Sequence, residues 1–148
     1  MAESSPPLSG RDALVCGASE GIGRASAFAL AASGASVCLL SRRRDALEAL
    51  RDELPCVHPA QSHRVIAADV GRTDALRDAL AALLASCPVQ ILVNNTAGPP
   101  GGAAHSADPE DYVAVFRQHL VAGQVLVQAV LPGMRAARWG RIVNIIST

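Results

Sequence analysis

The sequence of 148 residues lacks the features that several large classes of protein require. Its thirteen acidic residues balance thirteen basic ones, so no excess of positive charge is available to attract nucleic acid or an anionic membrane. No apolar run reaches the roughly 18 to 20 residues of a membrane span. The opening segment MAESSPPLSGR lacks the basic and apolar regions of a signal peptide. We therefore expect a cytoplasmic protein that has neither nucleic acid nor a membrane as its partner.

Cysteine and aromatic residues are few, and lysine is missing. The four cysteines are widely spaced and form no C-x-x-C pair, which argues against a disulfide framework and predicts no bound metal. Aromatic residues make up 3% of a chain that is 50% hydrophobic, so aliphatic side chains must build the core. All thirteen basic residues are arginine. The chain therefore contains no amine side chain that could titrate near neutral pH.

Short apolar segments alternate with helix-like segments from residue 11 onward. Strands are expected at 13–17, 35–41, 64–69, 90–95 and 141–146, and helices at 21–34, 44–54, 74–86 and about 108–137. This alternation is typical of a parallel sheet covered by helices on both faces, and right-handed crossovers give the strand order 3-2-1-4-5. We predict one α/β domain with a doubly wound (Rossmann) sheet over residues 11–148, after a disordered lead-in at residues 1–10.

The segment GASEGIG lies between the first expected strand and the first expected helix. Its glycines are Gly17, Gly21 and Gly23. A glycine turn at this place lets the backbone approach a diphosphate and presents the free N–H groups of a helix start to it. Because the motif lies within a complete βαβ unit, it predicts a bound dinucleotide.

The end of the second expected strand predicts which dinucleotide is bound. An NAD site needs a carboxylate here for the ribose 2′-hydroxyl, whereas NADP needs a cation for the 2′-phosphate. The strand ends with Ser41 in the place of an acid, followed at once by Arg42 and Arg43. A solvated arginine run would place cations at the positive end of a helix dipole, so a bound phosphate explains the cluster better. We predict NADP(H) as the cofactor.

Four motifs together resemble the short-chain dehydrogenase/reductase family: GASEGIG, AADV, VNNTAG and GRIVNIIST, in this order and at these separations. The resemblance covers about residues 11–148, and NNTAGPPGG is similar to the corresponding segment of 3-oxoacyl-carrier-protein reductases. It implies an oxidoreductase that interconverts a ketone and an alcohol. The implied cofactor-binding residues are Gly17, Ser19, Gly21, Ile22, Gly23, Arg42, Asp69, Val70 and Asn95. Ser147 would orient the substrate carbonyl.

Several positions depart from the family pattern. Cys16 stands in the place of a usual threonine, Thr96 or Ala97 disturbs the Asn-Asn-Ala-Gly signature, and Ile146 replaces a serine. His119 lies where many members have an active-site asparagine. A histidine in this apolar helix is more often a packed residue than a catalyst, so its role stays open.

The family's proton donor is a tyrosine whose pKa is lowered by a lysine four residues later, and this pair normally follows the serine. Here the single tyrosine, Tyr112, precedes it, has Phe116 four residues on, and has no lysine to act with. Two interpretations remain. The chain is the amino-terminal part of a longer reductase, which we favour, or a non-catalytic NADP(H)-binding sensor or partner subunit.

The expected substrate is a small carbonyl compound or alcohol, with 3-oxoacyl thioesters as the favoured example. The segment RIVNII offers an unpaired sheet edge, and the long helix is apolar on more than one face. We therefore expect this chain to self-associate or aggregate, and the full-length form to be a homodimer or homotetramer.

Overall fold

The computed structural model describes residues 5–98 and 101–146. Its elements follow the predicted alternation, with differences of at most two residues at their ends. In order they are β1 (Asp12–Cys16), α1 (Gly21–Ala32), β2 (Ser36–Ser41), α2 (Arg44–Glu53), β3 (Arg64–Ala67), α3 (Thr73–Leu84), β4 (Val89–Asn94), η1 (Ala104–Ser106), α4 (Pro109–Phe116), η2 (Arg117–Val121), α5 (Ala122–Ala136) and β5 (Arg141–Asn144).

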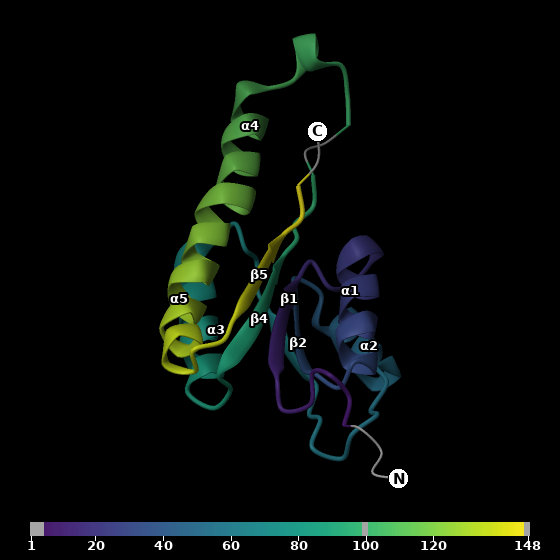
Figure 1. The fold of residues 1–148 in the computed structure, drawn as a ribbon. Coiled ribbons are helices and arrows are strands. Elements are labelled where there is room, and N and C mark those ends of the chain that lie inside the picture. Colours follow the sequence, from purple (N-terminus) through teal and green to yellow (C-terminus); the bar gives the residue numbers. More distant parts are fainter. Residues whose placement is uncertain (1–4, 99–100, 147–148) are drawn as a thin grey trace.

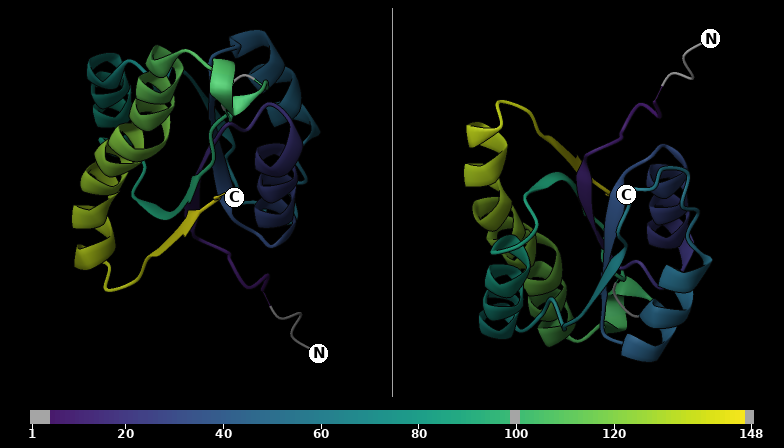
Figure 2. Two further views of the ribbon diagram at one scale, coloured as in Figure 1. Left: turned by 90° about the horizontal axis from the view of Figure 1, so that it is seen from above. Right: turned by 90° about the horizontal axis from the view of Figure 1, so that it is seen from below.

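The strands form one five-stranded parallel sheet in the order β3-β2-β1-β4-β5, which confirms the predicted topology. Helices α1 and α2 cover one face of the sheet, and α3, α4 and α5 lie on the other (Figure 1). The views along the sheet in Figure 2 show the same three layers. The fold is therefore the predicted doubly wound arrangement.

The core has two parts because successive strand residues point to opposite faces. In β1, Leu14 belongs to the cluster under α3 and α5, whereas Val15 belongs to the cluster under α1 and α2. Helix α1 presents Ala27 and Ala31 to the sheet, and these small side chains let it pack closely. Aliphatic residues dominate both clusters, as the scarcity of aromatic residues led us to expect.

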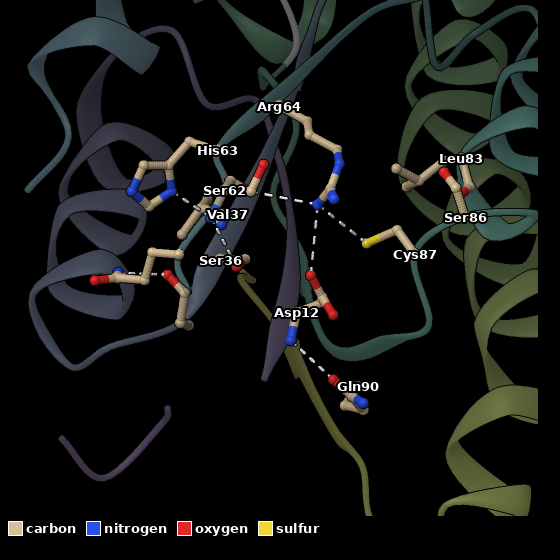
Figure 3. Close-up of polar contacts among 12 residues, drawn as sticks. Asp12, Ser36, Val37, Ser62, His63, Arg64, Leu83, Ser86, Cys87 and Gln90 are labelled. Carbon is tan, nitrogen blue, oxygen red and sulfur yellow. Dashed lines mark hydrogen bonds and ion pairs between the residues drawn. The ribbon is translucent and has the colours of Figure 1, made fainter. Parts of the chain in front are cut away.

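Polar side chains tie the amino ends of the strands together (Figure 3). The backbone N–H of Asp12 donates to Gln90 Oε1 at 2.8 Å, and Asp12 Oδ1 lies 3.6 Å from Arg64 Nη1. The backbone N–H of Val37 donates to His63 Nδ1 at 3.1 Å. These contacts satisfy backbone donors at the amino ends of β1 and β2.

The segment predicted as one long helix, about 108–137, is helical from Pro109 to Ala136, but the helix has an irregular middle. A π-helical turn, η2, joins α4 to α5. The stretch Pro109–Ala136 is long enough to cross a membrane, and an 18-residue window within it is apolar enough, with a mean hydropathy of 1.2, by length and composition alone. This is weak evidence for a span, because core helices reach the same values. Val125 and Val130 of α5 are buried in the core beneath it.

Part of the expected disordered lead-in is ordered. The backbone N–H of Leu8 donates to the carbonyl of Ser33 at 2.9 Å, at the end of α1, and that of Arg11 donates to the carbonyl of Leu8. Gly34 follows the end of α1 with a φ of +97°, which suits glycine, and a Cβ there would lie 2.7 Å from Pro6 Cβ. Residues 6–10 therefore pack against the domain, and residues 1–4 lie outside the described chain.

The single tryptophan lies at the same end of the sheet, just before β5. The Arg11 guanidinium carbon lies 4.1 Å from the centre of the Trp139 ring, and that of Arg141 lies 4.9 Å from it. Cation–π contacts of this kind join the start of β1 to the start of β5.

Candidate functional site

A cavity of about 800 Å³ lies at the carboxyl ends of β3, β2, β1 and β4. We call it the first cavity. It is lined by Gly17, Ser19, Glu20, Gly21, Ile22, Leu40, Ser41, Arg42, Arg43, Ala68, Asp69, Val70, Asn95, Thr96, Ala97 and Gln118. Every residue that the sequence assigned to the cofactor lines it except Gly23. Four segments that follow strands, together with Gln118 of η2, thus meet around one space, where ligands of open α/β sheets bind.

The glycine turn forms the floor of the first cavity. Gly17 has a φ of +60°, and a Cβ there would lie 2.6 Å from the carbonyl oxygen of Asn95. Gly21 has a φ of +55° with open space beside it, so the backbone is exposed to whatever enters. The Asn95 amide nitrogen lies 3.4 Å from the carbonyl oxygens of Cys16 and Gly17 and donates to them. The hydrogen bonds from Asn95 therefore fix the position of the glycine turn.

Gly23 does not line the first cavity, but packs beneath it. A Cβ at Gly23 would lie 2.1 Å from the carbonyl oxygen of Gly17. The third glycine therefore lets α1 approach the turn, and it contacts no space that a ligand could fill. The assignment of Gly23 to the cofactor stays a prediction. In this geometry Gly23 would affect the cofactor through the position of α1 and not by direct contact.

The amino end of α1 points its free backbone donors at this space. The first N–H groups of a helix have no partner within the helix, and the side chain of the capping residue, Glu20, accepts none of them. The helix dipole adds a partial positive charge at the same end. This arrangement can bind the oxygen atoms of a diphosphate.

The end of β2 provides the polar groups that distinguish phosphate from hydroxyl. The hydroxyl oxygen of Ser41 is buried and has no hydrogen-bond partner among the described residues. Arg42 and Arg43 are exposed, and no ion pair of the described chain includes either one. Two free guanidinium groups and a buried hydroxyl without a partner fit a ligand that carries an anionic group here.

Asp69 and Val70 lie in the turn after β3, since this strand ends at Ala67 rather than at the predicted residue 69. The Asp69 carboxylate accepts a hydrogen bond from the backbone N–H of Gly71 at 2.9 Å, which fixes the turn. Both residues line the first cavity on the side of Arg42. They can form the walls for a flat ring system such as adenine.

A second cavity of about 300 Å³ lies next to the first, between the ends of β4 and β5 and the η2 turn. Thr96 and Gln118 line both cavities, and His119 lines the second. Sequence reasoning did not assign Thr96 or Gln118 to a site. The sequence pointed to these two residues only indirectly. Thr96 interrupts a glycine signature, and Gln118 precedes the unusual histidine.

His119 contacts the loop after β4. Its Nδ1 lies 2.7 Å from Thr96 Oγ1, and its Nε2 lies 2.9 Å from the carbonyl oxygen of Ala97. His119 is half-buried, and both of its ring nitrogens have hydrogen-bond partners. It is therefore not the packed apolar-helix residue that we thought more common at such a position.

The remaining candidates for chemistry are placed differently. Ser147 lies outside the described residues, so its predicted role stays a prediction. Tyr112 is 60% exposed on α4 and lines neither cavity. Cys16 lines the second cavity, but burial raises the pKa of its thiol to about 12. That thiol stays protonated and cannot serve as a nucleophile.

The family model and the relatives that match this chain agree with one another. The model of the family described as short chain dehydrogenase matches residues 11–148. Among curated proteins, the NADPH-dependent reductase BacG of Bacillus subtilis is 33% identical over 143 residues, covering 94% of this chain and 54% of that protein. L-xylulose reductase of Mus musculus is 42% identical over 141 residues, covering 95% of this chain and 54% of that protein.

Solved structures match the fold closely. A metagenomic short-chain oxidoreductase in complex with NADP has a TM-score of 0.84 at 36% identity, covering 95% of this chain and 63% of that one. A 3-oxoacyl (acyl-carrier-protein) reductase from Agrobacterium tumefaciens C58 with NADP bound has a TM-score of 0.85 at 31% identity, covering 99% of this chain and 56% of that one. The chain spans about half the length of the curated relatives that it matches.

Proposed function

This chain belongs to the short chain dehydrogenase family, and on that premise we propose that its first cavity binds NADP(H). We further propose that it supplies the cofactor-binding part of a reductase that converts a ketone to an alcohol. The supporting observation is the end of β2, where Ser41, Arg42 and Arg43 line the cavity without an acidic residue among them. The names of the relatives agree, because they include NADPH-dependent reductases and structures with bound NADP.

The proposed binding mode assigns one part of the cofactor to each segment of the cavity. Arg42, with Ser41 and Arg43 beside it, would bind the 2′-phosphate, and Asp69 with Val70 would hold the adenine. The glycine turn and the start of α1 would bind the diphosphate. The nicotinamide half would then reach Asn95, at the end of β4. When bound, the reduced cofactor supplies the hydride for the carbonyl carbon.

Reduction of a ketone also requires a proton donor at the carbonyl oxygen. In this proposal Ser147 orients that oxygen, and a tyrosine and lysine outside the 148 residues provide the proton. Hydride transfer by this chain alone is not expected, because general acid catalysis is typically worth 10² to 10⁴ in rate. Assay of the purified chain with NADPH and a 3-oxoacyl thioester should show no turnover, and a rate typical of enzymes would contradict the assignment of roles.

A second candidate function follows from the sequence itself. The 148 residues include no lysine, and their only tyrosine lies on an exposed part of α4. A non-catalytic NADP(H)-binding sensor or partner subunit would need neither residue. The coding sequence after Thr148 separates the two functions, since an open frame with Tyr-x-x-x-Lys within about two dozen codons supports the reductase and its absence supports the binding protein.

We propose a small ketone as the substrate of the reductase, with 3-oxoacyl thioesters as the first class to test, because several relatives carry that name. We propose a cytoplasmic homodimer or homotetramer for the full-length form. Neither nucleic acid nor membrane is proposed as a partner.

Cofactor choice can be tested on the chain as it is. Calorimetry should show tighter binding of NADPH than of NADH, and Arg42→Ala should weaken NADPH binding about 10- to 150-fold, since a charge-assisted hydrogen bond is worth about 1.5 to 3 kcal/mol. Binding of NADH should not change. Arg135→Ala, which removes an exposed arginine that lies outside the cavity, is the matched control. Equal affinity of the unmodified chain for the two cofactors would contradict the proposal.

A further inference from the structure

Two positions at which the sequence departs from its family's pattern contact each other in the structure. Thr96 interrupts the glycine signature after β4, and His119 lies 23 residues later in the η2 turn. Their side chains are 2.7 Å apart, measured from Thr96 Oγ1 to His119 Nδ1. The two departures are therefore one structural unit rather than two separate changes.

The carbonyl group of Ala97 determines which nitrogen of His119 carries the proton. The carbonyl oxygen of Ala97 can only accept, and it lies 2.9 Å from His119 Nε2, so this nitrogen must carry a proton. The Thr96 hydroxyl lies 2.7 Å from Nδ1 and 3.1 Å from Nε2. In the neutral ring only Nδ1 is then an acceptor, so the hydroxyl donates to Nδ1. One imidazole thus holds a side chain and a backbone carbonyl of two consecutive residues.

These two residues form a shared wall with Asn95. We define the β4 wall as Asn95, Thr96 and Ala97, all of which line the first cavity. On one side Asn95 donates to the carbonyl oxygens of Cys16 and Gly17 at the glycine turn. On the other side His119 holds Thr96 and Ala97. The wall is fixed at both ends, by the glycine turn and by the helix.

The helix is irregular at the residue that provides this contact. Between α4 and α5 the backbone forms the π-helical turn η2, Arg117–Val121, and His119 is at its centre. A π turn shifts the direction of side chains relative to an unbroken α-helix, and such turns are frequent at functional sites. Here His119 is directed to the loop, while Leu120, next to it, is 60% exposed.

We infer that Thr96 and His119 act together as a positioning pair that sets the β4 wall for the nicotinamide half of the cofactor. The inference rests on the proposed function for the identity of the ligand. The two ends of the first cavity would then depend on different residues. The end with Arg42 recognises the adenosine half independently of the pair, and the end with Thr96 depends on the pair because only that end is formed by the wall.

The test compares two ligands that differ in the part that reaches the wall. NADPH fills both halves of the cavity, whereas adenosine 2′,5′-bisphosphate carries the adenine, the 2′-phosphate and one further phosphate only. Calorimetry is done on the whole chain with Thr96→Val, which keeps the size but removes the hydroxyl, with His119→Ala, and with both changes. Thr96→Ser, which keeps the hydroxyl, is the conservative control.

We expect Thr96→Val, which removes one hydrogen bond, to weaken NADPH binding about three- to tenfold, and His119→Ala, which removes that bond and the one to Ala97, to weaken it at least as much. The double variant should lose no more than the weaker-binding single variant, because the two residues act as a unit. Thr96→Ser should bind like the unmodified chain, and the bisphosphate should bind all forms equally. A purely structural defect would instead weaken both ligands, and Thr96→Ser would not restore binding.

Three results would overturn the inference. They are unchanged NADPH affinity in Thr96→Val and His119→Ala, equal losses for both ligands, or losses that add in the double variant. Where His119→Ala does not fold by circular dichroism, the pair Thr96→Val and Thr96→Ser decides alone. If the unmodified chain binds the bisphosphate, the proposed function stands whatever the variants do, whereas binding of neither ligand would overturn both.

Discussion

Strands β4 and β5 are neighbours in register, yet their surroundings differ. Leu92 of β4 pairs with Ile142 of β5, and Leu92 is completely buried whereas Ile142 is 37% exposed. Their sequences are similarly apolar, ILV in one and IV in the other. In the described sheet β4 has a strand on each side and β5 has one. The neighbouring elements therefore determine how far these side chains are buried, and apolar composition alone does not.

The same contrast divides the whole molecule. The region around β1 to β4 buries its own apolar side chains and provides every residue that lines the first cavity except Gln118 of η2. The region of β5 and α4 leaves apolar side chains exposed, including Tyr112, Val113 and Phe116 on α4 and Leu120 in the adjoining η2 turn. We call these four residues the α4 stripe. Stability and most contacts to the cofactor should depend on the first region, and association on the second.

The largest effect is expected from the register pair itself. Leu92→Ala leaves a cavity in the core and should lower the free energy of unfolding by about 2 to 5 kcal/mol. Ile142→Ala removes a partly exposed side chain at the neighbouring position and should cost under about 1.5 kcal/mol. Urea unfolding of the two variants measures the difference. Equal losses would mean that β5 is as well packed as β4, and would contradict the comparison.

A smaller loss is expected at the floor of the first cavity. Gly23→Ala places a Cβ against the carbonyl oxygen of Gly17, so α1 must move away from the turn. We expect a cost of about 1 to 3 kcal/mol, as for other overpacked sites, together with weaker NADPH binding. Gly133→Ala is the control, because it adds a methyl to α5 with no atom within 4 Å and should be neutral or stabilising. Thermal unfolding distinguishes the two, and a neutral Gly23→Ala would show that the helix position is not set by this contact.

The exposed region should be responsible for self-association. Phe116→Glu places a charge in the α4 stripe, where Phe116 is 56% exposed. Light scattering at micromolar concentration should show a lower average mass than for the unmodified chain, because an apolar contact is lost and a charge would be buried. Ala114→Glu adds the same charge to an exposed position of α4 outside the stripe and should have little effect. A monodisperse monomer for the unmodified chain would contradict the prediction.

The smallest effect concerns pH. Burial lowers the pKa of His63, whose Nδ1 accepts the backbone N–H of Val37 and therefore cannot be protonated without losing that contact. The unfolded chain has the ordinary pKa of about 6.5. The unfolded state therefore binds the proton more readily, and stability falls as pH drops from 6.5 through the lowered folded value. Unfolding at pH 7.5 and pH 5 should show this fall, and His63→Gln should reduce it.

The matched control for this measurement is His105→Gln, since His105 is exposed in η1. It should leave the pH dependence as it is in the unmodified chain. An unchanged pH dependence in His63→Gln would show that carboxylates, rather than this histidine, produce the loss of stability.

The fold could be predicted from the sequence because its signals are local. Alternating apolar and helical segments predicted the sheet order, and the glycine turn predicted where the first cavity lies. The strand ends were less accurate, as at Asp69, because the residues that leave a sheet to line a cavity keep the same apolar or polar character as those before them. Residues 6–10 were expected to be disordered because hydrogen bonds to the end of α1 leave no pattern in the sequence.

The contacts across the site were beyond prediction for a different reason. The pair Thr96 and His119 is separated by 23 residues, and it forms only because β4 and the η2 turn are adjacent in the fold. A π turn has no sequence signature of its own, so the direction of His119 could not be read from helical spacing. The burial of the Ser41 hydroxyl likewise depends on tertiary packing.

The indole between Arg11 and Arg141 gives this protein a built-in optical reporter. It is the only tryptophan in the chain, so all of the tryptophan fluorescence comes from the corner where the start of β5 meets the start of β1. That corner lies at the opposite end of the sheet from both cavities. Emission from Trp139 can therefore follow the detachment of the outermost strand without a dye, and a partly opened molecule would be visible before the rest of the domain unfolds.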